Sequence, residues 1–420
     1  MGFQQGLSGL NAASKNLEII GNNVANANTY GAKQSRAEFS DMYAAALGAG
    51  GTSNVGIGVN VQAVTQQFSE GNISTTGNSL DLAINGSGFF EVSSAGQTMY
   101  SRNGQFEVNK DGYLVTSGGG QLLGYPADAQ GVIQPGRSAP LQLPTAGIDP
   151  AATTKISMEM NLDSRAATTL PATTPQVNFS DATTYNNATS LTVYDAKGQD
   201  VALTYYFQKA ATDTWNVYVT ANGTSVSVDG AGNPLPLTTI DFPSNGGAPT
   251  APVGTVNLDV PASTNAAGAD TLAITGIQLD LAGATQFGAG FGVTNLTQDG
   301  YAPGQLSGLS IEKEGIVMAS YSNGQSKPAG QIELSTFRNT QGLKPMGGNL
   351  WSRTFDSGDP IVGTPGQGNL GVLQSGALEE SNIDLTAELV NMMTAQRVYQ
   401  ANAQTIKTED QVLQTLVNLR

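Results

Sequence analysis

The chain closes with LTAELVNMMTAQRVYQANAQTIKTEDQVLQTLVNLR, residues 385–420, and this stretch carries its strongest structural signal. Apolar side chains recur in it at alternating spacings of four and three residues, the pattern of the a and d positions of a coiled coil. This C-terminal stripe consists of Leu385, Leu389, Met392, Tyr399, Ile406, Leu413 and Val417. The pattern predicts an uninterrupted helix over 384–420, capped by Asp384 or by Asn382.

The start of the chain carries a stripe of the same kind, within a predicted helix over residues 3–27. This N-terminal stripe consists of Phe3, Leu7, Leu10, Leu17 and Val24. The segment that follows is rich in Asn and Gly, which predicts the helix end and a bend into the next domain. The expected junction residues are Asn22, Asn23, Asn26, Asn28, Thr29 and Gly31. A second, short helix is expected around 35–47.

Between the two ends, short β-type runs alternate with turn signals. Asn85-Gly86, Asn103-Gly104 and Asp111-Gly112 are strong hairpin signals, because a type I′ turn needs positive φ at both central residues. We expect one antiparallel β domain built from residues 55–148 and 291–372. A second all-β domain, residues 149–290, would be inserted into it.

The predicted fold class is therefore a multidomain α+β protein. Its terminal helices form a coiled coil, and two nested, mainly antiparallel β domains lie between them. Two helices that each need an apolar partner indicate a subunit that polymerises with copies of itself.

Composition excludes several classes of function. Charged residues make up only 12% of the chain and the formal net charge is −15, which argues against binding nucleic acid. Without His or Cys, most zinc sites, thiolate catalysis and disulfides are excluded. No apolar run approaches the ~20 residues that span a bilayer, so no membrane insertion is expected. No cleavable signal peptide is visible, so export would need a route that reads no such signal.

No constellation of residues stands out as a catalytic, cofactor-binding or metal site. Two acidic pairs, Glu379 with Glu380 and Asp356 with Asp359, could hold a cation, but a solvated surface explains them more simply. An enzyme is therefore not expected. A surface adhesin would explain the β domains and the acidity, but not the two apolar stripes.

Four segments resemble the axial proteins of the bacterial flagellum, the family of rod, hook and hook-associated subunits. They are Leu7–Ala13, Gly21–Gly31, Asn382–Met393 and Ala395–Ala403. The length of the chain and its ending, residues 402–411 and 416–420, are most similar to the hook subunits of this family. The resemblance covers roughly residues 1–130 and 295–420, and it is weak over 149–290. One departure is Ala32, where the family pattern carries Phe; Phe39 is a candidate replacement.

The resemblance implies a structural subunit that polymerises into a curved tube between rod and filament and transmits motor torque as a universal joint. Residues 1–54 and 373–420 would form the inner-tube domain, and 149–290 an outer domain. The implied partners are other copies of the chain, the distal rod protein, the hook cap protein, the hook–filament junction protein and the flagellar type III export apparatus. The implied location is the extracellular hook. A distal rod or hook-associated subunit is the nearest alternative.

Overall fold

The structure is a computed structural model that describes residues 2–42, 56, 58–128, 130–171 and 174–418. The chain divides into two compact units. Unit 1 contains residues 1–145, 308–320 and 326–420, and unit 2 contains residues 146–307 and 321–325. The chain therefore leaves unit 1, builds unit 2 and returns, so the first and last elements belong to the same unit.

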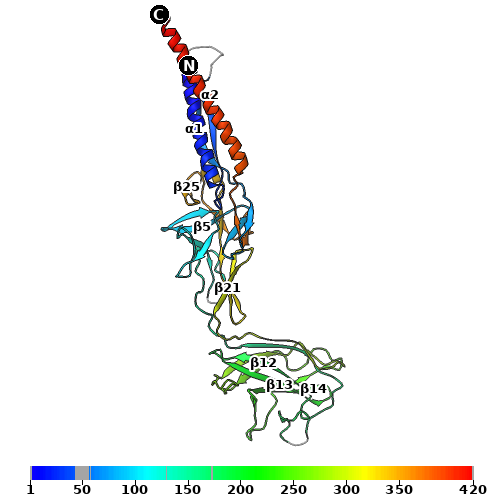
Figure 1. Ribbon diagram of the computed structural model, residues 1–420. Helices are drawn as coiled ribbons and strands as arrows, with labels where there is room; N and C mark the ends of the chain where they lie inside the picture. Colours follow the sequence, from blue (N-terminus) through cyan, green and yellow to red (C-terminus); the bar gives the residue numbers. More distant parts are fainter. Residues whose placement is uncertain (1, 43–55, 57, 129, 172–173, 419–420) are drawn as a thin grey trace. The chain divides into compact units, whose positions relative to one another are not determined.

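Two helices begin and end unit 1: α1 (Gly2–Asn26) and α2 (Leu385–Asn418). They lie side by side along their length (Figure 1). Their bounds agree with the helices predicted from the two apolar stripes. Among the described residues, neither helix combines the length and the hydropathy that crossing a membrane requires.

A hairpin of two strands, β1 (Ser35–Met42) and β2 (Gly58–Gln66), packs beside α1. The two strands pair antiparallel from Ser35 opposite Gln66 to Met42 opposite Gly58. The helix expected around 35–47 is therefore wrong for residues 35–42, and residues 43–47 lie outside the described part of the chain. Pairing with β2 provides hydrogen-bond partners for the backbone N–H and C=O groups of β1. This tertiary contact outweighs the weak local helix propensity.

The largest sheet of unit 1 combines strands from both ends of the chain. The order along its main path is β21-β22-β23-β9-β5-β6-β26-β25. These strands are β21 (Leu306–Ile311), β22 (Ile316–Tyr321), β23 (Ser326–Ile332), β9 (Gln121–Pro126), β5 (Phe89–Ser94), β6 (Gln97–Ser101), β26 (Leu350–Ser352) and β25 (Lys344–Gly347). Beside this path lie β7 (Phe106–Val108), β8 (Leu114–Thr116), β10 (Ala139–Pro140), β24 (Leu334–Thr336) and β27 (Ile361–Gly363). Residues before 145 and after 305 thus share one sheet.

Two short antiparallel pairs and one turn of 3-10 helix complete unit 1. The pairs are β28 (Val372–Ser375) with β4 (Leu82–Asn85), and β29 (Ala377–Glu379) with β3 (Ile73–Thr75). The 3-10 turn is η1 (Thr340–Gly342). One apolar core gathers around Phe90, Leu122 and Leu334, and a smaller aromatic cluster forms around Phe89, Tyr100 and Trp351. Because β29 leads directly toward α2, its position fixes where that helix begins.

Unit 2 consists of two sheets that enclose one core, which contains Trp215, Tyr205 and Phe207. The first sheet contains β11 (Lys155–Asn161), β17 (Val256–Val260), β18 (Ile274–Asp280), β19 (Ala284–Thr285) and β20 (Gly292–Gln298). The second contains β12 (Asn187–Tyr194), β13 (Asp200–Ala211), β14 (Thr214–Ala221), β15 (Thr224–Ser225) and β16 (Thr238–Asp241).

One expected domain boundary is displaced in unit 2. Residues from 291 onward were expected in the other β domain, but β20 pairs antiparallel with β11. The chain crosses back into unit 1 only near residue 308. The alternating polar and apolar residues of β20 fit an edge strand of either domain, so the local pattern does not distinguish the two.

Candidate assembly surface

The two terminal helices approach each other through glycines on α1. A Cβ atom at Gly6 would lie 3.0 Å from Cγ1 of Ile406, and one at Gly9 would lie 2.7 Å from Oδ1 of Asn402. A Cβ atom at either position would require the Ile406 or Asn402 side chain to shift, so the two glycines favour this close spacing. Within one copy, α1 therefore contacts α2 closely at Ile406 and Asn402.

The fold of one copy buries only part of the C-terminal stripe. Met392 and Ile406 are half-buried, while Leu385, Leu389, Tyr399 and Leu413 are exposed. The side chain of Val417 lies outside the described residues. Other large apolar side chains on α2 are exposed as well, namely Val390, Met393, Val398 and Val412. Leu389 is 46% exposed and Met393 is 53% exposed, so this helix offers an apolar surface to a partner.

The N-terminal stripe is covered unevenly. Phe3 and Leu7 are exposed, while Leu10, Leu17 and Val24 are half-buried. Phe39, the candidate replacement for an aromatic at position 32, is also exposed, whereas Ala32 is buried. Phe39 therefore does not occupy the buried position.

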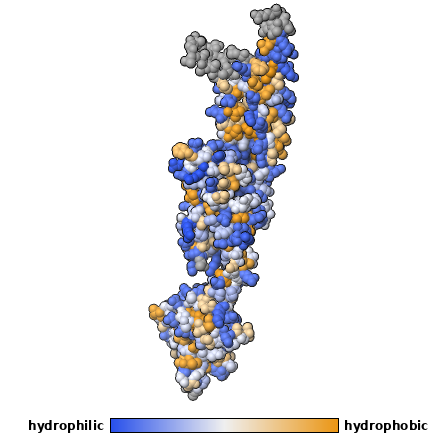
Figure 2. All heavy atoms as spheres, turned by 90° about the vertical axis from the view of Figure 1, so that its left-hand side faces the viewer, coloured by the Kyte–Doolittle hydropathy of each residue, from blue (hydrophilic) through white to orange (hydrophobic). Residues whose placement is uncertain are grey.

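A groove of about 850 Å³ runs between α1, α2 and the β1–β2 hairpin. Its lining is mostly small or apolar and includes Ala12, Ala13, Ile20, Ala395 and Val398. Figure 2 shows apolar side chains gathered on the helical end of unit 1. The groove and the exposed stripes together form a surface suited to receive apolar side chains from another molecule.

The junction after α1 is held by its asparagines and by one glycine. The Asn23 side chain accepts a hydrogen bond from the backbone N–H of Ser35 at 2.9 Å and donates one to its carbonyl at 2.8 Å. Asn26 donates to the carbonyl of Asn22, and the Thr29 N–H donates to the carbonyl of Asn26. Asn28 is exposed. These hydrogen bonds stabilise the C-terminal end of α1 and direct the chain toward the start of β1.

Gly31 is the tightest point of the junction. Its φ is +71°, and a Cβ atom there would lie 2.5 Å from the backbone nitrogen of Asn103. Its N–H donates to the carbonyl of Glu379 at 2.8 Å. Gly31 thus brings three distant segments into backbone contact, which any side chain would prevent.

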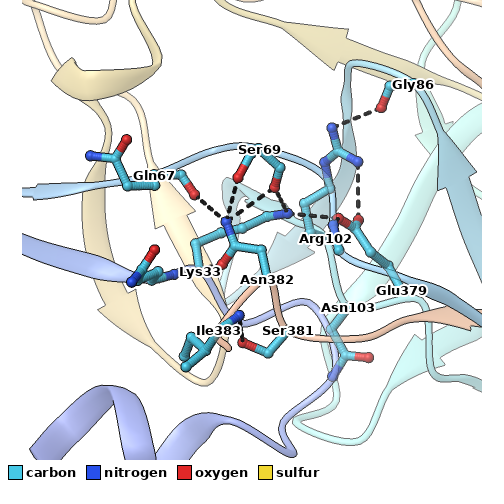
Figure 3. A network of polar contacts seen from close by, with 12 residues as sticks. Lys33, Gln67, Ser69, Gly86, Arg102, Asn103, Glu379, Ser381, Asn382 and Ile383 are labelled. Carbon is cyan, nitrogen blue, oxygen red and sulfur yellow. Dashed lines mark hydrogen bonds and ion pairs between the residues drawn. The ribbon is translucent and has the colours of Figure 1, made fainter. Parts of the chain in front are cut away.

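A buried ion network lies directly beside this junction (Figure 3). Glu379 Oε1 accepts a hydrogen bond from Lys33 Nζ at 2.6 Å, and its Oε2 accepts one from Arg102 at 3.0 Å. All three side chains are almost fully buried. Burial lowers the pKa of Lys33 below its ordinary value of 10.5, and the Glu379 carboxylate opposes that shift.

The remaining hydrogen bonds of the network involve the backbone: Lys33 donates to the carbonyl of Ser69 and Arg102 to that of Gly86, while Glu379 Oε1 also accepts from the Gly71 N–H at 3.0 Å. The network joins the end of α1, the strand before α2 and the large sheet. Removing Glu379 would leave Lys33 and Arg102 buried without a counter-ion.

The two candidate caps of α2 have separate roles. Asp384 Oδ1 accepts hydrogen bonds from the N–H groups of Thr386 and Ala387, so Asp384 caps the helix. The Asn382 side chain instead accepts from the Gln34 N–H and donates to the carbonyls of Gln67 and Ser69 (Figure 3). Asn382 therefore ties the start of α2 to the segments on both sides of the β1–β2 hairpin.

The solvated-surface interpretation of Glu379 is wrong, although it fits Glu380, which is exposed. The sequence interpretation also missed Lys33 and Arg102 as partners of this carboxylate. They lie 346 and 277 residues from Glu379 in the chain, so no local pattern connects them. The available signal was indirect, because Lys33, Asn382 and the asparagines all fall within or beside the segments that resemble a known family.

Comparison with known proteins agrees with this arrangement. Family models match at three places: the flagella basal body rod protein at 3–33, the flagellar basal body protein FlaE D2 domain at 161–301, and the flagellar basal body rod FlgEFG protein C-terminal at 374–419. The flagellar hook protein FlgE of Salmonella typhimurium is 43% identical, with all of both chains covered. The hook proteins of Escherichia coli and Rhizobium meliloti are 42% and 34% identical, and each match covers all of this chain.

A solved structure supports the fold. The crystal structure of the Helicobacter pylori flagellar hook protein FlgE2 covers 73% of this chain and 100% of its own, with a TM-score of 0.53 at 16% identity. The terminal helices, the nested β units and these matches together define a structural protein of the flagellar axial class. Within that class, the chain belongs to the family of flagellar hook proteins and is a structural subunit of the hook.

Proposed function

We propose that the chain polymerises into the curved tube of the hook and acts there as a universal joint that transmits torque from rod to filament. The observation that supports this most strongly is that one copy leaves much of both apolar stripes exposed. Inside one copy, α1 and α2 meet through Gly6 and Gly9, while Phe3, Leu7, Leu389 and many neighbours remain exposed. A stripe that the chain's own fold leaves open is available for other copies.

The free energy of covering these side chains is of the size that association requires. Burying a Leu, Val, Phe or Met side chain contributes about 1.5–3 kcal/mol. Losses of rotational, translational and side-chain freedom on association cost roughly 4–15 kcal/mol. Ten large apolar side chains on the described parts of the two helices are exposed, each by about half, so covering them contributes roughly 7–15 kcal/mol, which is comparable to this cost. Coiled-coil contacts through the stripes would then form between copies rather than within one.

In this proposal α1 and α2 line the inner tube, and unit 2, built mainly from residues 149–290, faces outward. A bent joint that rotates must lengthen and shorten each row of subunits once per turn. Wet, shallow contacts between outer domains permit that sliding at low cost. Cross-links engineered between neighbouring copies of unit 2 should therefore stiffen the tube; unchanged bending would refute the sliding contacts.

The remaining partners follow from the place of the hook in the flagellum. The chain would leave the cell through the flagellar type III export apparatus and assemble beneath the hook cap protein. Its lower end would meet the distal rod protein and its upper end the hook–filament junction protein. No catalytic role is proposed.

Electron microscopy of the purified protein at high concentration tests the proposal. We expect curved tubes from the intact chain, and a soluble, unpolymerised protein when residues 385–420 are deleted. Straight rods would favour the alternative of a distal rod subunit. A deleted chain that still formed tubes would contradict the role assigned to α2.

A further inference from the structure

Phe355 is the most exposed aromatic side chain among the described residues, at 100%. It lies in the connection between β26 and β27 of unit 1. The backbone on both sides of it is well held, because Ser357 is buried and its hydroxyl donates to the Thr354 carbonyl and accepts from the Thr354 N–H. Arg353 and Asp359 form an ion pair across the same loop. A rigid loop that presents a bare aromatic ring is typical of an interface anchor.

Unit 1 also contains an open groove of about 790 Å³ lined by β28, the end of β21 and the turn that follows β21. Val372 of β28 supplies most of its exposed apolar surface, beside Leu373 of the same strand and Ile311 of β21. Ile311 and Leu373 are buried, whereas Val372 is exposed. The turn Glu312–Glu314, with Lys313 between the two carboxylates, forms its charged rim. An aromatic ring placed here would cover the exposed side chain of Val372, beside charges of both signs.

We infer that Phe355 of one copy packs into the Ile311–Val372 groove of a neighbouring copy. This contact rests on the proposed assembly into a tube. In a helical polymer all copies are related by rotation about one axis and translation along it, so a loop on one copy can contact a different surface of the next copy. One charge on each side also matches, because the exposed Asp356 follows Phe355 and can pair with Lys313 of the groove rim.

The contact is heterologous, since a loop on one copy meets a different surface on the next. Contacts of this kind do not close on themselves unless the rotation completes a ring, and they otherwise extend into open helices. Phe355 would thus extend the subunit contacts from the terminal helices to the β part of unit 1.

Photo-cross-linking in assembled tubes tests the contact. The photoreactive residue p-benzoylphenylalanine replaces Phe355, and a mixture of isotopically light and heavy copies distinguishes links between chains from links within one. We expect interchain links to peptides that contain Ile311–Glu314 or Val372–Ser375. Val253, which is 94% exposed in unit 2, is the control position and should give no link to these peptides. Links from position 355 only to its own chain, or only to other segments, would overturn the contact while tubes still formed.

A pair of substitutions keeps the inference testable if the photoreactive variant does not assemble. Phe355→Ala and Val372→Glu, each at an exposed position, should both raise the critical concentration for assembly at least about tenfold. The double variant should be no worse than the poorer single variant, because both changes remove one contact. If the fold-increase in critical concentration of the double variant equalled the product of the two single fold-increases, the pairing of Phe355 with Val372 would be refuted. Failure of the unmodified chain to form tubes would instead refute the proposed function.

Discussion

Glu91 and Glu333 are buried carboxylates on neighbouring strands of the large sheet. Leu334 pairs with Phe90 and Ser335 with Phe89, so the same register places Glu333 opposite Glu91. Glu333 accepts a hydrogen bond from the Ser138 hydroxyl, but Glu91 Oε1 and Glu333 Oε2 have no hydrogen-bond partner among the described residues. Burial, reinforced by the Glu333 charge, raises the pKa of Glu91 to about 7.

This pair predicts that unit 1 loses stability as the pH rises. The pKa of Glu91 is raised above its ordinary value of 4.5, so its contribution is complete below that pH and is lost as the pH approaches about 7. The loss should be on the order of 3 kcal/mol. Tyr100 does not titrate in this window, because burial raises its pKa to about 12. Urea unfolding between pH 4.5 and 8 measures the effect.

Two variants complete the pH experiment. Glu91→Gln should reduce the dependence, since it removes one titrating carboxyl and leaves that of Glu333, whose pKa is also raised by burial, whereas Glu107→Gln at an exposed position of β7 should leave it unchanged. An equal slope in all three proteins would show that Glu91 is not its source.

Gly31→Ala should destabilise unit 1 by more than the cost of its backbone conformation alone. A non-glycine residue at positive φ costs roughly 1–2 kcal/mol. At Gly31 the added Cβ would also meet the Asn103 nitrogen at 2.5 Å, whereas at Gly77, with φ of +80°, it would meet nothing within 4 Å. Gly77→Ala therefore isolates the conformational cost. Equal losses in denaturant unfolding for the two variants would contradict the close packing at Gly31.

Glu379→Gln should be among the most damaging single substitutions in unit 1. It would leave Lys33 and Arg102 buried without a carboxylate, and breaking a buried ion pair costs about 3–5 kcal/mol. The neighbouring Glu380→Gln, at an exposed position, should change the free energy of unfolding very little. If the unfolding temperatures of the two variants differed only slightly, the ion network would not be what stabilises the junction.

At the scale of elements, the cap of α2 can be tested separately from its packing. Asp384→Ala should destabilise the helix by about 1 kcal/mol, because the N–H groups of Thr386 and Ala387 lose their acceptor. Asp384→Asn keeps an acceptor and should be nearly neutral. Far-UV circular dichroism during thermal unfolding compares them. A large loss of stability in the Asn variant would show that the charge of Asp384, and not its hydrogen bonds, stabilises the helix.

Elements with a strong internal period could be predicted from the sequence, and those defined by distant partners could not. The spacing of Leu385, Leu389 and Met392 is enough to predict α2. The strand β1 was expected as a helix, because its formation depends on pairing with β2 and not on its own residues. The ion network could not be predicted for the same reason, since Lys33, Arg102 and Glu379 come into contact only after the two ends of the chain have come together.

The same limit applies to the assembly surface. The periodicity identified apolar stripes on both helices, and the natural expectation was that they pack against each other. The glycine contacts at Gly6 and Gly9 could not be foreseen, because a glycine in a helix pattern has no period of its own.

At the scale of the whole molecule, our central claim is that sister copies cover the apolar stripes which one copy leaves open. The chain contains no cysteine, so Leu389→Cys provides a single reporter on the exposed stripe of α2, and Val253→Cys provides a matched reporter on unit 2. Alkylation rates of both thiols are measured in dilute monomer and in assembled tubes. We predict that Cys at position 389 reacts readily in the monomer and at least about tenfold more slowly in tubes, beyond any change at position 253. Equal reactivity at position 389 in both states would contradict the claim.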